Sequence, residues 1–394
     1  MNYELLKPEV QHFIISHIND DINKILLGKS PFPGISTREL VQQIDGKKRI
    51  EKKLPNWFNT PGIYFPQKLN IEQSSSELTA AYKSKLIQGD SLIDLTGGFG
   101  VDVTYFSKYA GQVYHIEQNE ELSNIAAHNS KILGISNIEF IKANSIEFLQ
   151  EAKDNFSTLY VDPARRIESQ KVFLLKDTLP DVVSNLPLFL SKAERVIIKT
   201  SPLFDIQSGL RELAHVSEIH VVSIKNDCKE LLWVIDRNFE GEPIIIASCL
   251  NQDTEERFSF KLSEEKDLPQ AETAAPEQYL YEPDVALLKA GGFKSIGSRF
   301  ELKKLNPNTH LYTSESFSNK FPGKVFRIRE VAMYKEWIKA RQRKKANIVS
   351  RNFPLSPDQI KKKHKLTDGG DDFLFFCTGN KNQLLVIDAQ KVTQ

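Results

Sequence analysis

The sequence predicts an α/β protein built on a doubly wound, mainly parallel sheet, with a helical segment before it and an α+β region after it. From residue 91 onward, short apolar runs alternate with helical stretches such as residues 119–134, as they do in parallel sheets covered on both faces. Before residue 60, apolar side chains recur at helical spacing, and beyond residue 277 strand-like runs surround a basic stretch. A chain of 394 residues is too long for one ordinary core, so two or three domains are expected.

The N-terminal segment is expected to be helical. Residues 10–27 place apolar side chains at helical spacing, and residues 36–44 begin with a serine that can cap a helix. A connection rich in proline and aromatic residues follows over residues 56–66. Residues 77–87 then form a predicted helix that closes at Gly89.

The central sheet is expected to contain strands at residues 91–96, 112–117, 138–143, 158–163, 195–200, 218–224 and 230–236. The last two are separated only by the short polar turn at residues 225–229, which predicts a hairpin and therefore an antiparallel edge strand. More strand-like material follows at residues 242–250 and 257–262. A polar stretch, residues 264–278, then has the composition of a linker.

The C-terminal region has a different pattern. Residues 279–293 predict a helix followed by a turn, and later strands are expected at residues 310–316, 324–331, 372–379 and 384–389. Between these strands lies the basic stretch, residues 335–365, which carries eleven Lys or Arg but only one Asp and one Glu. Such a stretch suits a phosphate backbone, although most charge runs are solvated helix faces.

Composition excludes several classes of function. The 52 basic residues almost cancel the 51 acidic ones, so the net charge gives no sign of a nucleic-acid partner. Three widely spaced cysteines provide neither a disulfide framework nor a zinc-ligand spacing, and the histidines show no ligand spacing either. The first residues lack a signal-peptide pattern, and no apolar run approaches the roughly 20 residues of a membrane span. We therefore expect a cytoplasmic protein without a metal site.

A glycine-rich loop after the first strand of the sheet is the most informative part of the sequence. The strand ends at Asp94, the loop carries Gly97, Gly98 and Gly100, and the next strand ends at Glu117. Glycines at the carboxyl end of a parallel strand let the backbone approach a ligand closely, because no Cβ is in the way. An acid about 20 residues further on is placed to accept hydrogen bonds from ribose hydroxyls. The pattern predicts a nucleoside site.

The acid before the loop narrows the choice of ligand. A dinucleotide fingerprint has the spacing G-x-G-x-x-G around a pyrophosphate, and this loop has a different spacing. Asp94 would repel a pyrophosphate, whereas it can hold a positively charged amino group. S-adenosylmethionine (SAM) carries an amino-acid moiety and a sulfonium, so SAM fits better. A dehydrogenase is accordingly the least favoured enzyme.

A third acid closes a later strand of the same sheet. Residues 158–161 are followed by Asp162-Pro163, and in a doubly wound sheet this strand end faces the same crevice as Asp94 and Glu117. We therefore expect Asp162 where the methyl group and the substrate meet. An Asp-Pro turn is common by itself. An acid with glycines, a second acid and an Asp-Pro pair on successive strands are much rarer together.

At these motifs, residues 72–236 resemble a class I SAM-dependent methyltransferase. The segment DLTGGFG matches the first motif of that family, with Thr96 in place of its usual first glycine. Glu117 matches the acid that binds the ribose, and Gln118 follows it. The resemblance implies that these residues, with Asp94 and the glycine loop, bind the cofactor.

Two further positions match the family less closely. Asn144 or Ser145 stands where the family contacts the adenine amino group, although the usual acid is absent. The segment VDPARR matches the fourth motif loosely, with Pro163 among the residues near the cofactor. Enzymes that methylate exocyclic base nitrogens typically carry Asp/Asn-Pro-Pro-aromatic there, and Ala164 and Arg165 replace the last two residues.

The whole chain resembles a little-characterised bacterial group that joins a methyltransferase domain to a ferredoxin-like piece and a THUMP-like tail. Residues 351–376 (RNFPLSPDQIKKKHKLTDGGDDFLFF) belong to the matching part. The resemblance implies a Rossmann-like seven-stranded sheet, SAM as the cofactor and RNA, ribosomal or transfer, as the partner, since THUMP domains bind RNA. The implied domains are helical N-terminal, methyltransferase, ferredoxin-like and THUMP-like RNA-binding, at residues 1–70, 71–265, 275–322 and 323–394.

Two acceptors of the methyl group remain open. Asp162 can accept a hydrogen bond from an attacking amine and orient its lone pair, which favours transfer to a base nitrogen. Ribose 2′-O-methylases use a Lys-Asp-Lys-Glu set instead, for which this chain offers Asp162 with Lys83 or Lys85, Lys199 and Glu230. A pyrimidine C5 methylase would need a nucleophilic cysteine near the Asp162 loop, and the sequence has none there.

Basic residues are the candidate substrate contacts. They are Arg165 and Arg166 beside the expected active site and, in the basic stretch, Arg341, Arg343, Lys344, Lys345 and Arg351. Trp337 and Phe353 in the same stretch either stack on bases or belong to the core. Two alternatives stay open: a protein or small-molecule methylase, and a catalytically silent RNA-binding protein that keeps SAM only structurally.

Overall fold

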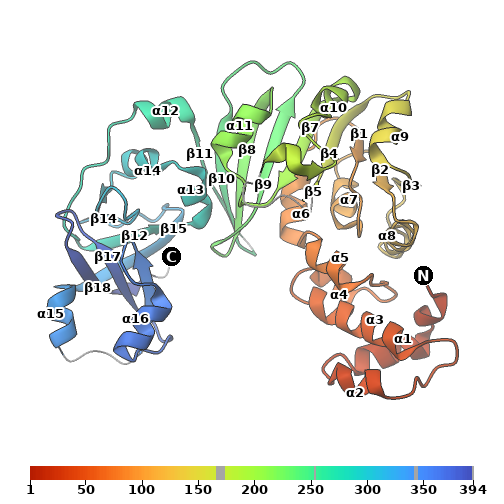
Figure 1. Ribbon diagram of the computed structural model, residues 1–394, viewed down its shortest axis with the longest axis horizontal. Coiled ribbons are helices and arrows are strands. Elements are labelled where there is room, and N and C mark those ends of the chain that lie inside the picture. The colour runs from red at the N-terminus through yellow and green to blue at the C-terminus, as the bar shows by residue number, and fades with distance from the viewer. Residues whose placement is uncertain (166–173, 253, 341–344, 393–394) are drawn as a thin grey trace. The chain divides into compact units, whose positions relative to one another are not determined.

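The computed structural model describes residues 1–165, 174–252, 254–340 and 345–392 (Figure 1). The chain divides into two compact units. The first comprises Met1–Ser217 with Leu232–Gly241, and the second comprises Glu218–Leu231 with Glu242–Gln394. Among the described residues, none of the helices combines the length and the apolar character that a membrane span needs.

The first unit begins with short helices, as the periodicity predicts. They are η1 (Tyr3–Leu6, a 3-10 helix), α1 (Pro8–Ser16), α2 (Ile22–Leu27), α3 (Thr37–Ile50), α4 (Pro55–Asn59), α5 (Lys68–Gln73) and α6 (Glu77–Ser84). The helical pattern over residues 10–27 is divided between α1 and α2, because Asp21 caps a new helix by accepting from the Asn23 N–H. Ser36 and Glu39 form the capping box that starts α3.

The sheet of the first unit has the predicted doubly wound arrangement. Its elements are β1 (Ser91–Asp94), α7 (Val101–Phe106), β2 (Gln112–Glu117), α8 (Glu120–Ile132), β3 (Ile138–Lys142), α9 (Ser145–Glu151), β4 (Phe156–Val161), β5 (Ala164–Arg165), η2 (Leu175–Asp177), β6 (Thr178–Leu179), α10 (Leu186–Lys192), β7 (Ala193–Thr200), α11 (Ile206–Glu212) and the end of β9 (Asp227–Asp236). The strand order is β9-β7-β4-β1-β2-β3, with β5 and β6 forming a separate pair. The order reverses between β1 and β4, where Asp94 lies in register with Tyr160. Such a reversal point is where α/β sheets bind ligands.

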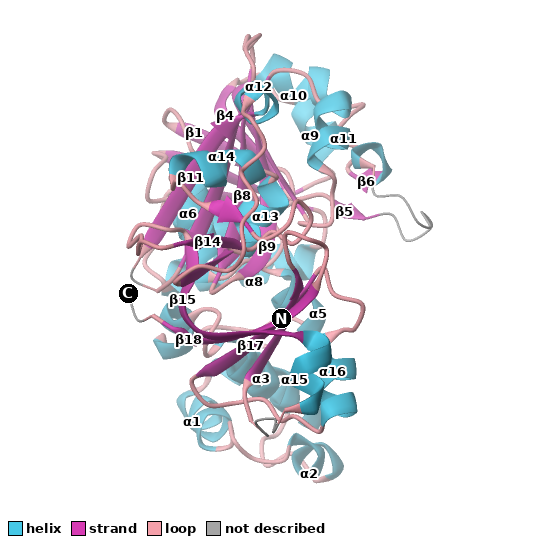
Figure 2. Cartoon of the chain, turned by 90° about the vertical axis from the view of Figure 1, so that its left-hand side faces the viewer, coloured by secondary structure: helices cyan, strands magenta, loops and turns pink. Residues whose placement is uncertain are grey.

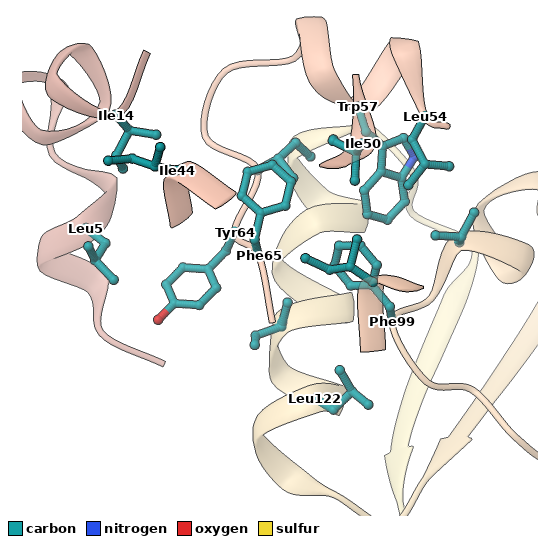
Figure 3. Close-up of a cluster of buried hydrophobic side chains, with 14 of the residues drawn as sticks. Leu5, Ile14, Ile44, Ile50, Leu54, Trp57, Tyr64, Phe65, Phe99 and Leu122 are labelled. Carbon is teal, nitrogen blue, oxygen red and sulfur yellow. The ribbon is translucent and has the colours of Figure 1, made fainter. Parts of the chain in front are cut away.

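The N-terminal helices share one hydrophobic core with the loop and helix that follow β1 and β2 (Figure 3). Leu5, Ile44 and Trp57 belong to this cluster together with Phe99 and Leu122. The Trp57 and Phe99 rings meet edge to face with centroids 5.0 Å apart. Because these side chains are buried against one another, the helical segment is part of the first unit and not a separate globule.

The predicted hairpin is formed by β8 (Val216–Ile224) and β9, which contribute residues to both units. Their connection is tighter than expected, because Lys225 and Asn226 alone make the turn, with φ of 51° and 63°. In the second unit, β10 (Ile244–Leu250) pairs in parallel with β8, and β11 (Glu255–Lys261) pairs antiparallel with β10. These two strands correspond to the strand-like runs expected at residues 242–250 and 257–262.

The second unit also contains a mixed sheet with the order β13-β14-β12-β15-β18-β17-β16. Figure 2 labels β14, β15, β18 and β17 of this sheet. The remaining elements are α12 (Leu262–Asp267), β12 (Tyr279–Pro283), α13 (Val285–Ala290), α14 (Phe293–Arg299), β13 (Lys303–Lys304), β14 (Tyr312–Ser314), β15 (Gly323–Met333), α15 (Tyr334–Lys339), β16 (Asn347–Arg351), α16 (Pro357–His364), β17 (Asp372–Thr378) and β18 (Leu384–Lys391). Two expectations were wrong in detail. The polar stretch at residues 264–278 begins inside α12, and residues 279–293 begin with strand β12 because it pairs with β14 and β15.

Candidate cofactor and methyl-transfer site

Hydrogen bonds through Thr96 tie together two strand ends, those of β1 and β4. Asp94 closes β1 and is 1% exposed, and its Oδ1 accepts from the Thr96 N–H at 2.9 Å and from the Thr96 hydroxyl at 3.2 Å. The Thr96 Oγ1 in turn accepts from the backbone N–H of Asp162, at 2.7 Å, just beyond β4. Threonine at this position, where the family resemblance led us to expect glycine, thus joins the glycine loop to the Asp-Pro segment.

The backbone of the glycine loop lies very close to two other side chains, at Gly97 and at Gly100. A Cβ on Gly97 would lie 2.4 Å from Nε2 of His115, whose ring is fully buried beneath the loop. Gly100 has φ of 83°, and a Cβ there would lie 2.9 Å from the Cβ of Ala126. Side chains at either position would push the loop outward, and this explains the glycines in physical terms.

The acid at the end of β2 faces the same loop. One carboxylate oxygen of Glu117 accepts from the Gly98 N–H at 3.0 Å, and the other accepts from the Asn119 N–H at 2.7 Å. At the end of β3, the Asn144 side-chain oxygen caps α9 by accepting from the N–H groups of Ile146 and Glu147. Asn144 therefore orders the strand-to-helix turn itself.

Two adjoining cavities lie along these strand ends. The smaller, about 140 Å³, is lined by Asn70, Gln73, Ser74, Ser75, Asp94, Thr96, Gly97, Gly98, Phe99, Gly100, Val101, Asp102, Leu122 and Asp162. The larger, about 630 Å³, is lined by Asn70, Gln73, Leu95, Thr96, Gly98, Ile116, Glu117, Gln118, Asn119, Leu122, Ala143, Asn144, Ser145, Ile146, Asp162, Ala164, Leu179 and Pro180. Asp162 lines both cavities, whereas Asp94 lines only the smaller and Glu117 only the larger.

Burial raises the pKa of Asp94 to about 8. The negative charges of Asp102 and Asp162 act in the same direction, whereas the hydrogen bonds from Thr96 oppose the shift. The smaller cavity therefore holds a carboxyl group that a nearby cation would ionise. Burial lowers the pKa of His115 to about 4, so its imidazole is neutral at neutral pH and serves as a packing group beneath the loop.

Asp162 and Lys199, the two candidates for catalysis, form an ion pair. The Lys199 Nζ contacts Oδ2 of Asp162, and the two side chains are 16% and 32% exposed, respectively. Lys199 extends from the end of β7, the strand next to β4 in the sheet. Pro163 is half-buried after Asp162. From the sequence, Asp162 was expected to orient an amine acceptor, and Lys199 was expected to act as the base in the alternative reaction on a ribose. The structure places the two residues in contact.

Sequence reasoning missed a group of residues that precede the sheet. Asn70, Gln73, Ser74 and Ser75, from α5 and the connection after it, line the smaller cavity. A run of short polar residues just before an amphipathic helix was the available signal, but such runs usually mark only a helix cap. Lys83, considered only for the ribose-methylase set, is fully buried on α6.

The candidate substrate contacts are placed differently from one another. Lys345 is exposed and forms an isolated bridge with Thr367. Arg351 instead donates to Oε1 of Glu282, a 4% exposed carboxylate, at 2.7 Å. The backbone of Arg165 belongs to β5. Arg166, Arg341, Arg343 and Lys344 lie outside the described residues.

The two aromatic residues of the basic stretch belong to a core. Trp337 and Phe353 are half-buried against the cluster around Phe376, with ring centroids 5.1 and 5.5 Å from that of Phe376. The Tyr334 hydroxyl and Nε2 of His364 lie 2.9 Å apart beside the same cluster. Of the two interpretations left open for these aromatic residues, the packing role is the one that the structure provides.

Comparison with known proteins adds matches to both parts of the chain. A ferredoxin-like domain model matches residues 279–322, and a THUMP domain-like model matches residues 323–390. A crystal structure of a Porphyromonas gingivalis W83 protein, assigned as a methyltransferase, superposes with a TM-score of 0.89. That protein is 33% identical, and the match covers 100% of this chain and 99% of that one.

Two curated relatives are more distant. An uncharacterised RNA methyltransferase of Mycoplasma mobile is 25% identical over 221 residues, which are 49% of this chain and 60% of the relative. The match thus spans less than two-thirds of that relative's length. An uncharacterised SAM-dependent methyltransferase of Mycobacterium tuberculosis is 22% identical over 306 residues, 75% of this chain and 79% of the relative.

The match to the Porphyromonas structure agrees with the fold described above. The Porphyromonas protein carries most weight, because one-third of its residues are identical over its full length. The match of residues 323–390 to the THUMP domain-like model adds the C-terminal domain that characterises the group named in the sequence analysis. The chain belongs to the class I SAM-dependent methyltransferases that carry a C-terminal THUMP-like domain.

Proposed function

We propose that this protein transfers a methyl group from SAM to a base nitrogen of RNA, next to Asp162. The observation that carries the proposal is the place of Asp162, which lines both the smaller and the larger cavity. A cofactor with an amino-acid half and an adenosine half would have its sulfonium where the two cavities adjoin. Asp162 is therefore a carboxylate at the expected point of transfer.

The residues around the cavities fit SAM. Asp94 and the loop from Gly97 to Gly100 line the smaller cavity and would hold the amino-acid half. Glu117 would bind the ribose hydroxyls, and the adenine would lie near Gln118, Asn144 and Ser145. When bound, SAM supplies a methyl group that is activated by the positive sulfur. The chain's own task is then to align the acceptor and to manage its proton.

Asp162 suits an amine acceptor. Lys199 contacts Oδ2, and a carboxylate has about four lone-pair positions, so Asp162 can accept an N–H of an attacking amine while the ion pair persists. That hydrogen bond would orient the nitrogen lone pair toward the methyl group. The lysine would meanwhile hold the carboxylate in place.

RNA is supported as the substrate from two directions. A relative is named as an RNA methyltransferase, and residues 323–390 match a THUMP-like domain. Lys345 and the exposed Lys362 and Lys363 of α16 lie within residues 323–394, which the sequence predicts to be the RNA-binding domain. These lysines would contact phosphates. Transfer or ribosomal RNA is the class we propose.

A second candidate is methylation of a ribose 2′-oxygen, favoured by the contact between Lys199 and Asp162. In that reaction a lysine would take the proton of the hydroxyl. To act so, Lys199 must first lose its own proton, which would leave the Asp162 carboxylate without its cationic partner. For this reason we place the base nitrogen first.

The test is to incubate the purified chain with methyl-labelled SAM and total RNA from cells that lack this gene. The RNA is digested to nucleosides and the labelled nucleoside is identified by mass, with Asp162→Asn and Lys199→Met run in parallel. We expect label on a base nitrogen, a loss of roughly 100-fold or more in Asp162→Asn and a smaller loss in Lys199→Met.

The other outcomes are equally informative. Label in alkali-resistant dinucleotides would identify a ribose 2′-oxygen and move the catalytic role to Lys199. Label in protein or small molecules but not in RNA would reject the RNA substrate. If SAM binds but no label is transferred to any fraction, the protein is instead a catalytically silent RNA-binding protein that keeps SAM only structurally.

A further inference from the structure

We infer that Leu179 of β6, with Pro180 after it, forms the surface against which the target base lies while it accepts the methyl group. This inference rests on the proposed function, because it names the contact that would hold the acceptor of that reaction. It requires a base that has left its stack, since the faces of a stacked base are covered by its neighbours. Leu179 would thus determine specificity from outside the set of residues proposed to hold the cofactor.

Leu179 lies opposite the segment that carries Asp162. Ala164 of β5 pairs with Leu179 of β6 in the two-stranded antiparallel sheet that follows β4 (Figure 2). Both residues line the larger cavity, together with Pro180 and Asp162. Because Asp162 is the carboxylate proposed to orient the acceptor, this apolar surface borders the place where the acceptor would lie.

The segment around Leu179 is anchored, and its anchoring keeps this leucine out of the core. Leu175 and Val182 are fully buried and Thr178 is 1% exposed, whereas the intervening Leu179 is 58% exposed. The Thr178 hydroxyl lies 2.6 Å from the carbonyl oxygen of Leu175 and 2.9 Å from that of Pro180. These contacts fix the backbone on both sides of Leu179. Its exposure is therefore a property of an ordered segment that lines a cavity.

The larger cavity has two separate groups of apolar side chains. Ile116, Ala143 and Ile146 come from the ends of β2 and β3 and from α9, beside the residues proposed to hold the adenine. Leu179 and Pro180 come from the segment at and after β6, which follows β4. In the sheet, β4 and β2 lie on opposite sides of β1. The cofactor accounts for the first group, and the second group remains for another flat ligand.

Aliphatic side chains suit the face of a base. A base taken out of its stack is held by stacking between aromatic or apolar side chains. Among the described residues, no aromatic side chain lines the larger cavity, so aliphatic groups would cover the base there. Of the apolar residues on the β5 and β6 side, Leu179 offers the largest side chain. A ribose acceptor has no such flat face, so this contact fits transfer to a base nitrogen.

A purely structural role explains Leu179 less well. Isolated exposed apolar residues are common on protein surfaces and need no ligand. Leu179, however, lines the same cavity as the candidate catalytic carboxylate, Asp162, and its immediate neighbours are buried. An apolar side chain held at that place has a use if it meets an apolar part of the substrate.

The experiment separates contact with the target base from contact with the cofactor or with the RNA backbone. Initial rates of methyl transfer from labelled SAM to total RNA from cells lacking this gene give kcat/KM for the full chain, Leu179→Ala, Leu179→Asn and Leu179→Phe. Isothermal titration calorimetry measures binding of S-adenosylhomocysteine, the cofactor without its methyl group. Filter binding measures RNA affinity in its presence. Leu27→Ala is the matched control, because Leu27 of α2 is 88% exposed and lines neither cavity.

We expect Leu179→Ala and Leu179→Asn to lower kcat/KM about tenfold or more, because each removes apolar surface that the base would cover. Leu179→Phe should keep at least half of kcat/KM, since a ring also covers a base. The dissociation constants of S-adenosylhomocysteine and RNA should change less than threefold, because phosphate contacts supply much of the RNA affinity. Leu27→Ala should change none of these quantities.

Four results would overturn the inference while leaving the methyltransferase proposal intact. They are an unchanged kcat/KM in Leu179→Ala, a loss in Leu179→Phe as large as in Leu179→Ala, a loss explained by weaker S-adenosylhomocysteine binding, and a loss explained by weaker RNA binding. The third would assign Leu179 to the cofactor, and the fourth would make it a general RNA contact. If the unaltered chain labels no base in RNA, the inference falls together with the proposed function.

Discussion

Cofactor binding should tighten as the pH rises, because the buried Asp94 must ionise to meet the ligand ammonium. The carboxyl group is 1% exposed, and burial raises its pKa to about 8. Below that pH the folded, ligand-free protein holds a proton on Asp94. An ammonium placed beside it favours the carboxylate, so binding releases the proton and is opposed by acid.

The size of the effect follows from the ionised fraction. With a pKa of about 8, roughly 1% of Asp94 is ionised at pH 6.0 and roughly 24% at pH 7.5. If only the ionised form binds, the dissociation constant of S-adenosylhomocysteine falls about 24-fold over this interval, equivalent to about 1.9 kcal/mol. The pKa of about 4 for His115 places its titration below this window.

Isothermal titration calorimetry provides two independent readings. The dissociation constant is measured at intervals from pH 6.0 to 7.5, and the binding enthalpy at pH 7.0 is compared in buffers of different ionisation enthalpy. We expect release of about 0.9 proton per ligand at pH 7.0. Asp94→Asn should bind more weakly at pH 7.5 and lose the pH dependence. A dissociation constant that stays within twofold across the range, with no proton release, would refute the reasoning.

Three further predictions concern packing and charge. Gly97→Ala should weaken binding of S-adenosylhomocysteine at least tenfold and lower the unfolding free energy by about 1–3 kcal/mol, because the added Cβ would lie 2.4 Å from the buried His115 ring. In urea titration, the loss of unfolding free energy should be smaller when His115→Ala is also present. His115 has a pKa lowered from 6.5 to about 4, so its contribution is present above pH 6.5 and is lost as the pH falls toward 4. The loss amounts to about 2 kcal/mol at pH 5, and His115→Gln should therefore lose less stability than the unaltered chain between pH 7 and 5 in thermal unfolding. Arg351→Met should lower the unfolding free energy by about 3 kcal/mol, because the 4% exposed Glu282 would then keep only the more distant Lys324, at 3.9 Å, of its two cationic partners named here. Unchanged stability together with weaker RNA binding would instead support Arg351 as an RNA contact.

The strand ends of the site were predictable because their geometry depends on local sequence. Asp94, Glu117 and Asp162 each follow a short apolar strand, and parallel strands bring their carboxyl ends to one edge of the sheet. The alternation of strands and helices likewise predicted the order in which these residues come together. Their positions around adjoining cavities follow from that topology, whereas their roles stay predictions.

Other features depend on contacts that no local pattern encodes. The pairing of Arg351 with Glu282 joins residues 69 positions apart, and a basic residue within a basic stretch gives no sign of such a partner. The short β12 pairs with β14 and β15, although only Asp284 separates it from helix α13. The ion pair between Lys83 of α6 and Asp102 of α7 likewise forms only because the two helices pack against each other.

The shared core explains why a helical segment ahead of the sheet can take part in the site. Phe99 lies within the glycine loop and Leu122 lines both cavities, and both are buried among side chains from the N-terminal helices. The apolar contacts that hold these helices therefore also hold the cavity wall and the connection Asn70–Ser75. Removing the N-terminal helices would expose Phe99, whose ring packs against Trp57, and would also leave the cavity wall without its supporting contacts. We therefore expect cofactor binding and packing of the N-terminal helices to be coupled, since the same buried surface supports the helices and the cavity wall.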